Sequence, residues 1–199
     1  MTINHLFSMA TSAIGWKTGA HDIQYQIFDA DDKYGHKRVL AFQGTDVDFD
    51  PKTWRFRASL KDLLIDAGFL PAFGTHGWPL GLHAIFPEIE RIYAQSKPVD
   101  YITGWSLGGM IAQALYPFHR RIVTFGSPRV VPRICKPTCP DSQFHIVHSG
   151  DGLIDLYPAI LYKRSGMTIK VGEGTKRFRT HNISAYAEAI EDEIGHWEV

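Results

Sequence analysis

The chain has 199 residues and a mass of 22.5 kDa, and 44% of its residues are apolar, which is enough to build one hydrophobic core. Basic and acidic residues number 21 each, and this balance argues against a general nucleic-acid-binding protein. Two cysteines are too few for a disulfide framework, and no apolar run reaches the roughly 18 residues that a membrane span needs. We therefore expect a single domain over residues 1–199 without a transmembrane segment.

The N-terminal segment, Met1 to Ala20, lacks a basic region followed by a long apolar stretch, so we expect no signal peptide. The sequence favours a cytoplasmic protein, although export by another route would leave no mark of this kind. In that setting Cys135 and Cys139 are expected to be free thiols.

The first part of the chain contains a helix and two strands before its pattern becomes irregular. Apolar spacing predicts a helix over Asn4–Ile14, and alternation predicts strands over Ile23–Phe28 and Arg38–Phe42. The following segments have weaker secondary-structure patterns. They are an aperiodic stretch over Asp46–Arg57, an expected helical turn over Leu60–Leu64 and a Pro- and Gly-rich loop over Pro71–Gly81.

From Leu82 onward, helices and strands alternate. The expected elements are a helix over Leu82–Tyr93 that kinks or begins at Pro87, strands over Asp100–Thr103, Arg121–Phe125 and Phe144–His148, a buried helix over Leu107–Tyr116, a loop over Pro128–Asp141, a hairpin within Leu161–Arg179 and a last helix over Ile183–Ile194. Such alternation is typical of an α/β fold with a mostly parallel central sheet flanked by helices. Sites in these sheets form at the carboxyl ends of the strands.

The clearest candidate for chemistry is Ser106, in the segment Gly104-Trp105-Ser106-Leu107-Gly108-Gly109. This G-x-S-x-G pattern stands between an expected strand and an expected helix, where a sharp turn exposes a nucleophilic serine. Glycines at 104 and 108 leave room because they have no Cβ. The alternative interpretation is a glycine-rich turn with an incidental serine, and the flanking strand and helix weigh against it.

A serine needs a base to be nucleophilic, and the base needs an orienting carboxylate. Among ten histidines, His181 stands just before the last helix, whereas His196 stands close to the C-terminus. The order Ser, then Asp or Glu, then His selects His181 as the candidate base. Asp151 follows the strand over Phe144–His148 closely and is our preferred carboxylate, with Asp155 as the alternative.

An oxyanion hole requires two backbone amides aimed at one point. Leu107, the residue after the candidate nucleophile, is expected to supply one of them. Thr45 is expected to supply the other, because it follows the strand over Arg38–Phe42 and the turn at Gly44.

Several segments together resemble the class 3, fungal-type lipase family. Residues 41–45 (Ala-Phe-Gln-Gly-Thr) are similar to its F-R-G-[ST] segment, residues 104–109 to its G-H-S-L-G-G elbow and residues 123–130 to its T-F-G-x-P-R-V stretch. The strand before Asp151 and the pair His181 and Tyr186 resemble its later catalytic segments, the last with wider spacing, and residues 76–78 resemble its H-x-G-F segment. The resemblance covers roughly residues 38–190.

The chain departs from that pattern at several points. Trp105 replaces the usual histidine, and Gln43 replaces an arginine. The proline that follows the family's aspartate by three residues is missing after Asp151 but present after Asp155, which keeps the alternative open. The chain is short for the family, so any lid or loop insertion at residues 46–59 would be small.

The resemblance implies an α/β-hydrolase-like fold and a serine carboxylic ester hydrolase, a lipase or esterase, that needs no cofactor. Its substrate would be a small-molecule or lipid ester, and transient contact with a lipid surface is left open. The aromatic residues expected to contact substrate are Trp54, Phe56, Trp78 and Trp105.

Two other functions remain open, namely an acyltransferase or thioesterase with the same residues, and a catalytically inactive binding module. No metal site is expected, because Asp46, Asp48 and Asp50 begin like a calcium-binding loop but lack its glycine and glutamate.

Overall fold

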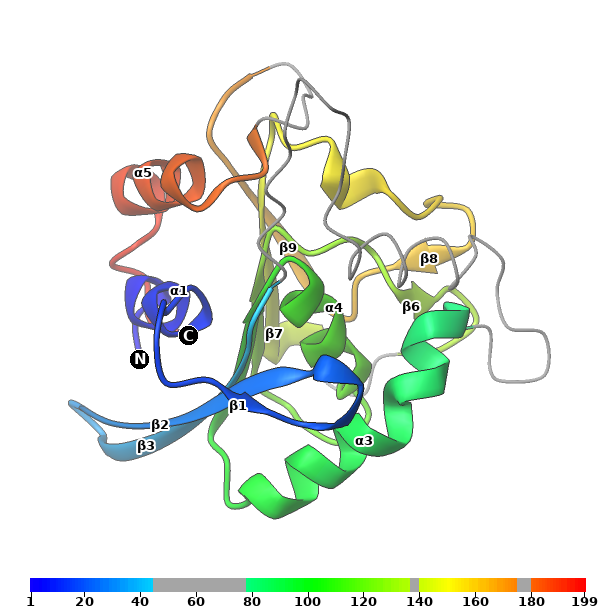
Figure 1. Cartoon of the computed structure of the whole chain (residues 1–199). Coiled ribbons are helices and arrows are strands. Elements are labelled where there is room, and N and C mark those ends of the chain that lie inside the picture. The colour runs from blue at the N-terminus through cyan, green and yellow to red at the C-terminus, as the bar shows by residue number, and fades with distance from the viewer. Residues whose placement is uncertain (45–77, 137–139, 175–179) are drawn as a thin grey trace.

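The computed structural model describes residues 1–44, 78–136, 140–174 and 180–199 (Figure 1). Its centre is a seven-stranded sheet with the strand order β1-β2-β3-β4-β5-β7-β9. The strands are β1 (Lys17–Thr18), β2 (Gln24–Asp32), β3 (Gly35–Phe42), β4 (Tyr101–Trp105), β5 (Ile122–Phe125), β7 (Gln143–His148) and β9 (Met167–Val171). The strands from β3 to β9 pair in parallel, whereas β1 and β2 extend the sheet by antiparallel pairing.

Helices cover both faces of this sheet (Figure 1). One face carries α1 (Ile3–Ala10) and α5 (Ile183–Glu193), and the other carries α3 (Leu80–Ser96) and α4 (Leu107–Ala114). The mostly parallel, helix-flanked α/β architecture predicted from the sequence is therefore confirmed.

The two faces have separate cores because neighbouring residues of a strand point to opposite sides. Along β3, Leu40 and Phe42 pack toward α3 and α4, whereas Val39 packs toward α1 and α5. Along β4, Ile102 joins the first core, while Tyr101 and Trp105 join the second. The central strands β4, β5 and β7 are buried on both sides, as parallel sheets require.

Helix α3 passes through Pro87 without ending there, so the helix does not begin at the proline. A proline inside a helix removes one backbone hydrogen bond and crowds the preceding turn. The apolar stripe of Leu82, Ile85, Ile89 and Ile92 is buried against the sheet, and this packing outweighs the local preference.

The segment after β7 differs from the expected hairpin. Residues Tyr162–Lys163 form β8, which pairs with β6 (Val131–Pro132) in a separate two-stranded sheet. Strand β9 then joins the main sheet in parallel to β7. The expected loop over Pro128–Asp141 thus holds a short strand, and the residues that would complete a hairpin include 175–179, which lie outside the described residues.

The described helices include none that is long and apolar enough to cross a membrane. The expected irregular stretch over Asp46–Arg57, the turn over Leu60–Leu64 and most of the loop over Pro71–Gly81 lie outside the described residues.

Candidate active site

Ser106 stands in a strained turn between β4 and α4. Its backbone has φ 53° and ψ −116°, a region that residues with a Cβ rarely adopt. The turn is possible because a Cβ at Gly104 would lie 2.3 Å from the carbonyl oxygen of Gly108. Strand, strained turn and helix are the structural context that the sequence pattern requires.

The end of β3 lies directly against this turn. A Cβ at Gly108 would lie 2.1 Å from the carbonyl oxygen of Phe42, and one at Gly44 would lie 3.1 Å from the Cβ of Ser106. Leu107 is the first residue of α4, so its amide has no acceptor within the helix. Thr45, the other expected oxyanion residue, lies outside the described residues. Gly44, the residue before it, lies close to Ser106.

His181 lies between Ser106 and Asp151 and contacts both. Its Nε2 is 2.8 Å from Ser106 Oγ, and its Nδ1 is 2.6 Å from Asp151 Oδ2. An ionised carboxylate can only accept hydrogen bonds, so Nδ1 carries the proton of the neutral ring. Nε2 is then free to accept a hydrogen bond from the Ser106 hydroxyl.

Asp151 is fully buried and is surrounded by hydrogen-bond donors. The Tyr186 hydroxyl donates to Oδ2 at 2.7 Å, and the Leu153 amide donates to Oδ1 at 2.8 Å. These bonds offset the desolvation of a buried carboxylate. Burial, with the nearby negative charge of Asp151, raises the pKa of Tyr186 well above its usual value, so this hydroxyl remains a donor.

Asp155, the alternative carboxylate, has a different partner. Its Oδ1 accepts a hydrogen bond from the guanidinium of Arg129. A second arginine, Arg164, donates to the carbonyl oxygens of Ser127 and Ile154 and so ties the loop after β5 to the loop that carries Asp151. Burial is the main cause that lowers the pKa of Arg164, to about 10, which leaves it charged at neutral pH.

The aromatic residues expected to contact substrate fall into three groups. Trp105 is 5% exposed, and its ring stacks on His181. Trp78 packs against Phe86 and Tyr116, beyond the C-terminal end of α4, whereas Ser106 precedes its N-terminal end. Trp54 and Phe56 lie outside the described residues.

Three contacts of the site were not anticipated as such. The sequence comparison named Tyr186 but did not assign its hydroxyl to Asp151, and nothing pointed to Arg164 or to the stacking of Trp105 on His181. Only the resemblance of the pair His181 and Tyr186 to the family's last catalytic segment carried a usable signal. The contacts of Arg164 depend on loops whose path the sequence does not fix.

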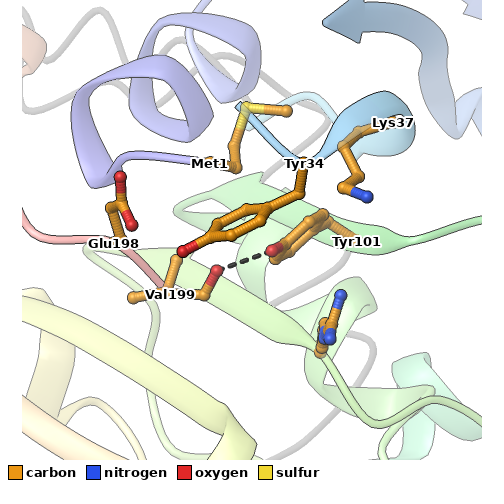
Figure 2. Close-up of a pocket in the computed structure, with 7 residues that line it drawn as sticks. Met1, Tyr34, Lys37, Tyr101, Glu198 and Val199 are labelled. Carbon is orange, nitrogen blue, oxygen red and sulfur yellow. Dashed lines mark hydrogen bonds between the residues drawn. The ribbon is translucent and has the colours of Figure 1, made fainter. Parts of the chain in front are cut away.

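The cavity in Figure 2 lies near the amino-terminal end of β4, opposite the end of this strand that precedes Ser106, and its volume is about 360 Å³. Tyr101, the first residue of β4, lines it and donates a hydrogen bond to the carbonyl oxygen of Val199. Ser106 follows the last residue of that strand, about 17 Å away at the usual rise of an extended chain. This cavity is therefore separate from the candidate site. Within the described ranges, no cluster of side chains is suited to hold a metal ion.

Among solved structures, the chain is similar to the Lip2 lipase from Yarrowia lipolytica. The two are 16% identical, with a TM-score of 0.46, over 85% of this chain and 77% of that chain. No family model matches the chain, and no curated protein matches it.

Proposed function

We propose that this protein is a serine carboxylic ester hydrolase, a lipase or esterase similar to class 3 lipases. The observation that carries the proposal is the continuous chain of hydrogen bonds from Ser106 through His181 to Asp151, beside the first amide of α4. A buried aspartate, a histidine with a defined tautomer and a serine in a strained turn are the components that activate a hydroxyl for acyl transfer.

In the proposed reaction, Ser106 Oγ attacks the ester carbonyl carbon while its proton passes to His181 Nε2. The carbonyl π electrons move to oxygen, and the amide of Leu107 donates to this oxyanion, with Thr45 as the proposed second donor. Collapse of the tetrahedral intermediate expels the alcohol, which takes the proton from His181. Water, deprotonated by the same ring, then hydrolyses the acyl-enzyme.

Asp151 acts through His181 and does not touch the substrate. Its Oδ2 holds Nδ1 in the protonated state and balances the charge of the imidazolium that forms during attack. The bonds from Tyr186 and Leu153 fix this carboxylate in place, so the ring has one orientation in which it faces Ser106.

The substrate class proposed from the sequence is a lipid-like ester, with Trp54 and Phe56 near an apolar–water boundary. Each further buried methylene of an acyl chain could contribute about 0.8 kcal/mol to binding. Comparing kcat/KM for acetate and octanoate nitrophenyl esters tests this, and equal values would leave a small-ester esterase. Thioesters and added alcohols as acceptors test for a thioesterase or an acyltransferase.

A fluorophosphonate probe tests the proposal most directly, because it modifies only an activated serine. The wild type should be labelled and should hydrolyse nitrophenyl esters, and Ser106→Ala should lose the label and on the order of 10⁴ or more in rate. Ser12→Ala is the matched control, since that hydroxyl is exposed and bonds only to the nearby carbonyl of Ile14 in the described structure. A folded wild type that takes up no label would instead support a catalytically inactive module.

A further inference from the structure

The indole of Trp105 lies face to face with the imidazole of His181. Their ring centroids are 5.0 Å apart, and their planes differ by 25°. Trp105 is the last residue of β4 and directly precedes Ser106, so a rigid strand sets the position of its ring. The face of an aromatic ring is electron-rich, and it attracts a cation placed above it.

The Trp105 ring is held in this position by its surroundings. Tyr186 packs edge-on against it at 4.8 Å, and Phe7 packs edge-on at 6.2 Å. On another side lies Gly126, where a Cβ would be only 2.9 Å from Trp105 Cζ3 and 3.3 Å from His181 Cε1. Gly126 thus leaves room for both rings, and the indole has little freedom to turn away from His181.

We infer that Trp105 is a positioning residue for His181, holding the ring toward Ser106 and stabilising its imidazolium form through the face of the indole. The imidazolium forms when Ser106 Oγ gives its proton to Nε2 and bonds to the carbonyl carbon. The positive charge then lies above the indole on one side and is bonded to Asp151 at Nδ1. The effect on rate rests on the proposed function, whereas the effect on ring protonation does not.

Other titratable groups lie in contact with His181 or with its partners. They are Asp151 from the loop after β7, the Tyr186 hydroxyl from α5, His148, whose ring lies against Tyr186, and Arg164, whose charge acts on Asp151 and Tyr186. All of these remain when Trp105 is replaced. Substitutions at position 105 therefore test the indole face, and because Trp105 also packs against Tyr186, the shift that they cause is compared with that of Tyr186→Phe, which removes the hydroxyl from Asp151.

The experiment follows the Cε1 resonance of His181 by NMR as a function of pH, assigned by its loss in His181→Gln. The full chain is compared with Trp105→Phe and Trp105→Leu. The titration midpoint should fall by about one pH unit in Trp105→Leu and by less in Trp105→Phe, because a cation over an aromatic face gains enough to shift a protonation equilibrium by that much. The control Phe86→Leu, which removes an aromatic ring on α3 that packs against Trp78 and Phe118 and does not touch Trp105, should leave the midpoint unchanged.

Activity gives a second readout. The acid limb of the kcat/KM profile should move to lower pH together with the midpoint, and kcat should decrease in the order Trp, Phe, Leu, by about tenfold over the series. A folded Trp105→Leu protein with the wild-type midpoint would overturn the inference. If that variant does not fold, Trp105→Phe decides, and an unchanged midpoint there overturns it equally. A shifted midpoint in a protein that hydrolyses no ester would refute the proposed function and leave this inference standing.

Discussion

His145 within the sheet and His181 in the loop before α5 are both held by hydrogen bonds, and only His181 is placed to act as the proposed base. His145, in the middle of β7, has Thr124 Oγ1 2.8 Å from Nδ1 and Ser165 Oγ 3.0 Å from Nε2. His181, beyond the carboxyl ends of the strands, likewise has a hydroxyl on one nitrogen, but its other nitrogen meets the Asp151 carboxylate. Both rings are bonded on both sides, so hydrogen bonding alone does not distinguish them.

The difference lies in what each ring can do with a second proton. The Gly166 amide donates to His145 Nε2, and burial lowers the pKa of His145 to about 3, so this ring stays neutral and ties β5 and β7 to the turn at Ser165. At His181 the Asp151 carboxylate accepts from Nδ1, and Nε2 faces the Ser106 hydroxyl. A histidine becomes a base through the charge of its partner, not through burial.

Replacing each of the two histidines in turn gives the largest expected effect. His181→Ala should lower kcat for ester hydrolysis on the order of 10⁵ without large loss of stability, because the base is gone while the core remains. His145→Gln should keep kcat per folded molecule within about tenfold but unfold more easily, because buried donors and acceptors lose their partners at about 1–3 kcal/mol each. Kinetics with thermal melts of both variants measure this, and equal losses of kcat would contradict the comparison.

The next largest effect is expected at the carboxylate that pairs with His181, which distinguishes this histidine from His145. Asp151→Asn should lower kcat by about 10⁴, because an amide no longer fixes the Nδ1 proton. Asp155→Asn should cost far less, since that side chain pairs with Arg129 at a partly exposed site. Steady-state kinetics of the two variants decide between them, and a larger loss at Asp155 would assign the acid role to that residue.

Tyr186→Phe sharpens the comparison further by removing one donor from Asp151 while keeping the ring. The carboxylate would retain the Leu153 amide and His181, so kcat should fall by about tenfold, the worth of one hydrogen bond to a charged group. The matched control is Tyr93→Phe, whose hydroxyl donates to the carbonyl of Phe118 far from the site. Equal kcat for Tyr186→Phe and wild type would show that the hydrogen bond from Tyr186 to Asp151 does not contribute to the rate.

The smallest expected effect is on stability in mild acid. The folded protein keeps His145 neutral, with its pKa at about 3, whereas the unfolded chain protonates it near pH 6.5. The unfolded state therefore binds more protons, and this contribution to stability decreases as pH falls below about 6.5. From pH 7 to 5.5 the loss is about 1 kcal/mol, and thermal melts should show that it is absent in His145→Gln. The same pH dependence in both proteins would exclude His145 as its source.

The sequence predicted the fold well because buried parallel strands and amphipathic helices have strong periodic patterns. It also named Ser106, His181 and Asp151, which the structure brings into one line of hydrogen bonds, because chain order and distance from strand ends restrict the choice. Contacts between side chains from distant segments carry no such pattern. Trp105 was expected to face the substrate, yet its ring lies against His181, since the alternation of β4 turns it toward the core of α1 and α5.

Trp78 also shows that contacts between distant segments could not be predicted from the sequence. It was expected to contact substrate, as one of the aromatic residues that cluster in sequence around the candidate site, but it packs at the far end of α4. The small sheet of β6 and β8 was missed because two-residue strands give no period. The apolar face of the last helix allowed the helix itself to be predicted. Its contact with Asp151 depends on the hydroxyl of Tyr186, which no periodic pattern indicates.

The segment from His181 to Tyr186 supplies both the proposed base and a hydrogen-bond donor to Asp151, so the proposed activity depends on how firmly α5 stays attached. If α5 opens away from α1 and the sheet in a local fluctuation, Ser106 keeps its strained turn but loses its proton acceptor. Such openings occur at lower free energy than global unfolding in many proteins. On heating or in mild denaturant, the proposed turnover would then vanish before the sheet melts, and the loss of activity would report the detachment of a single helix.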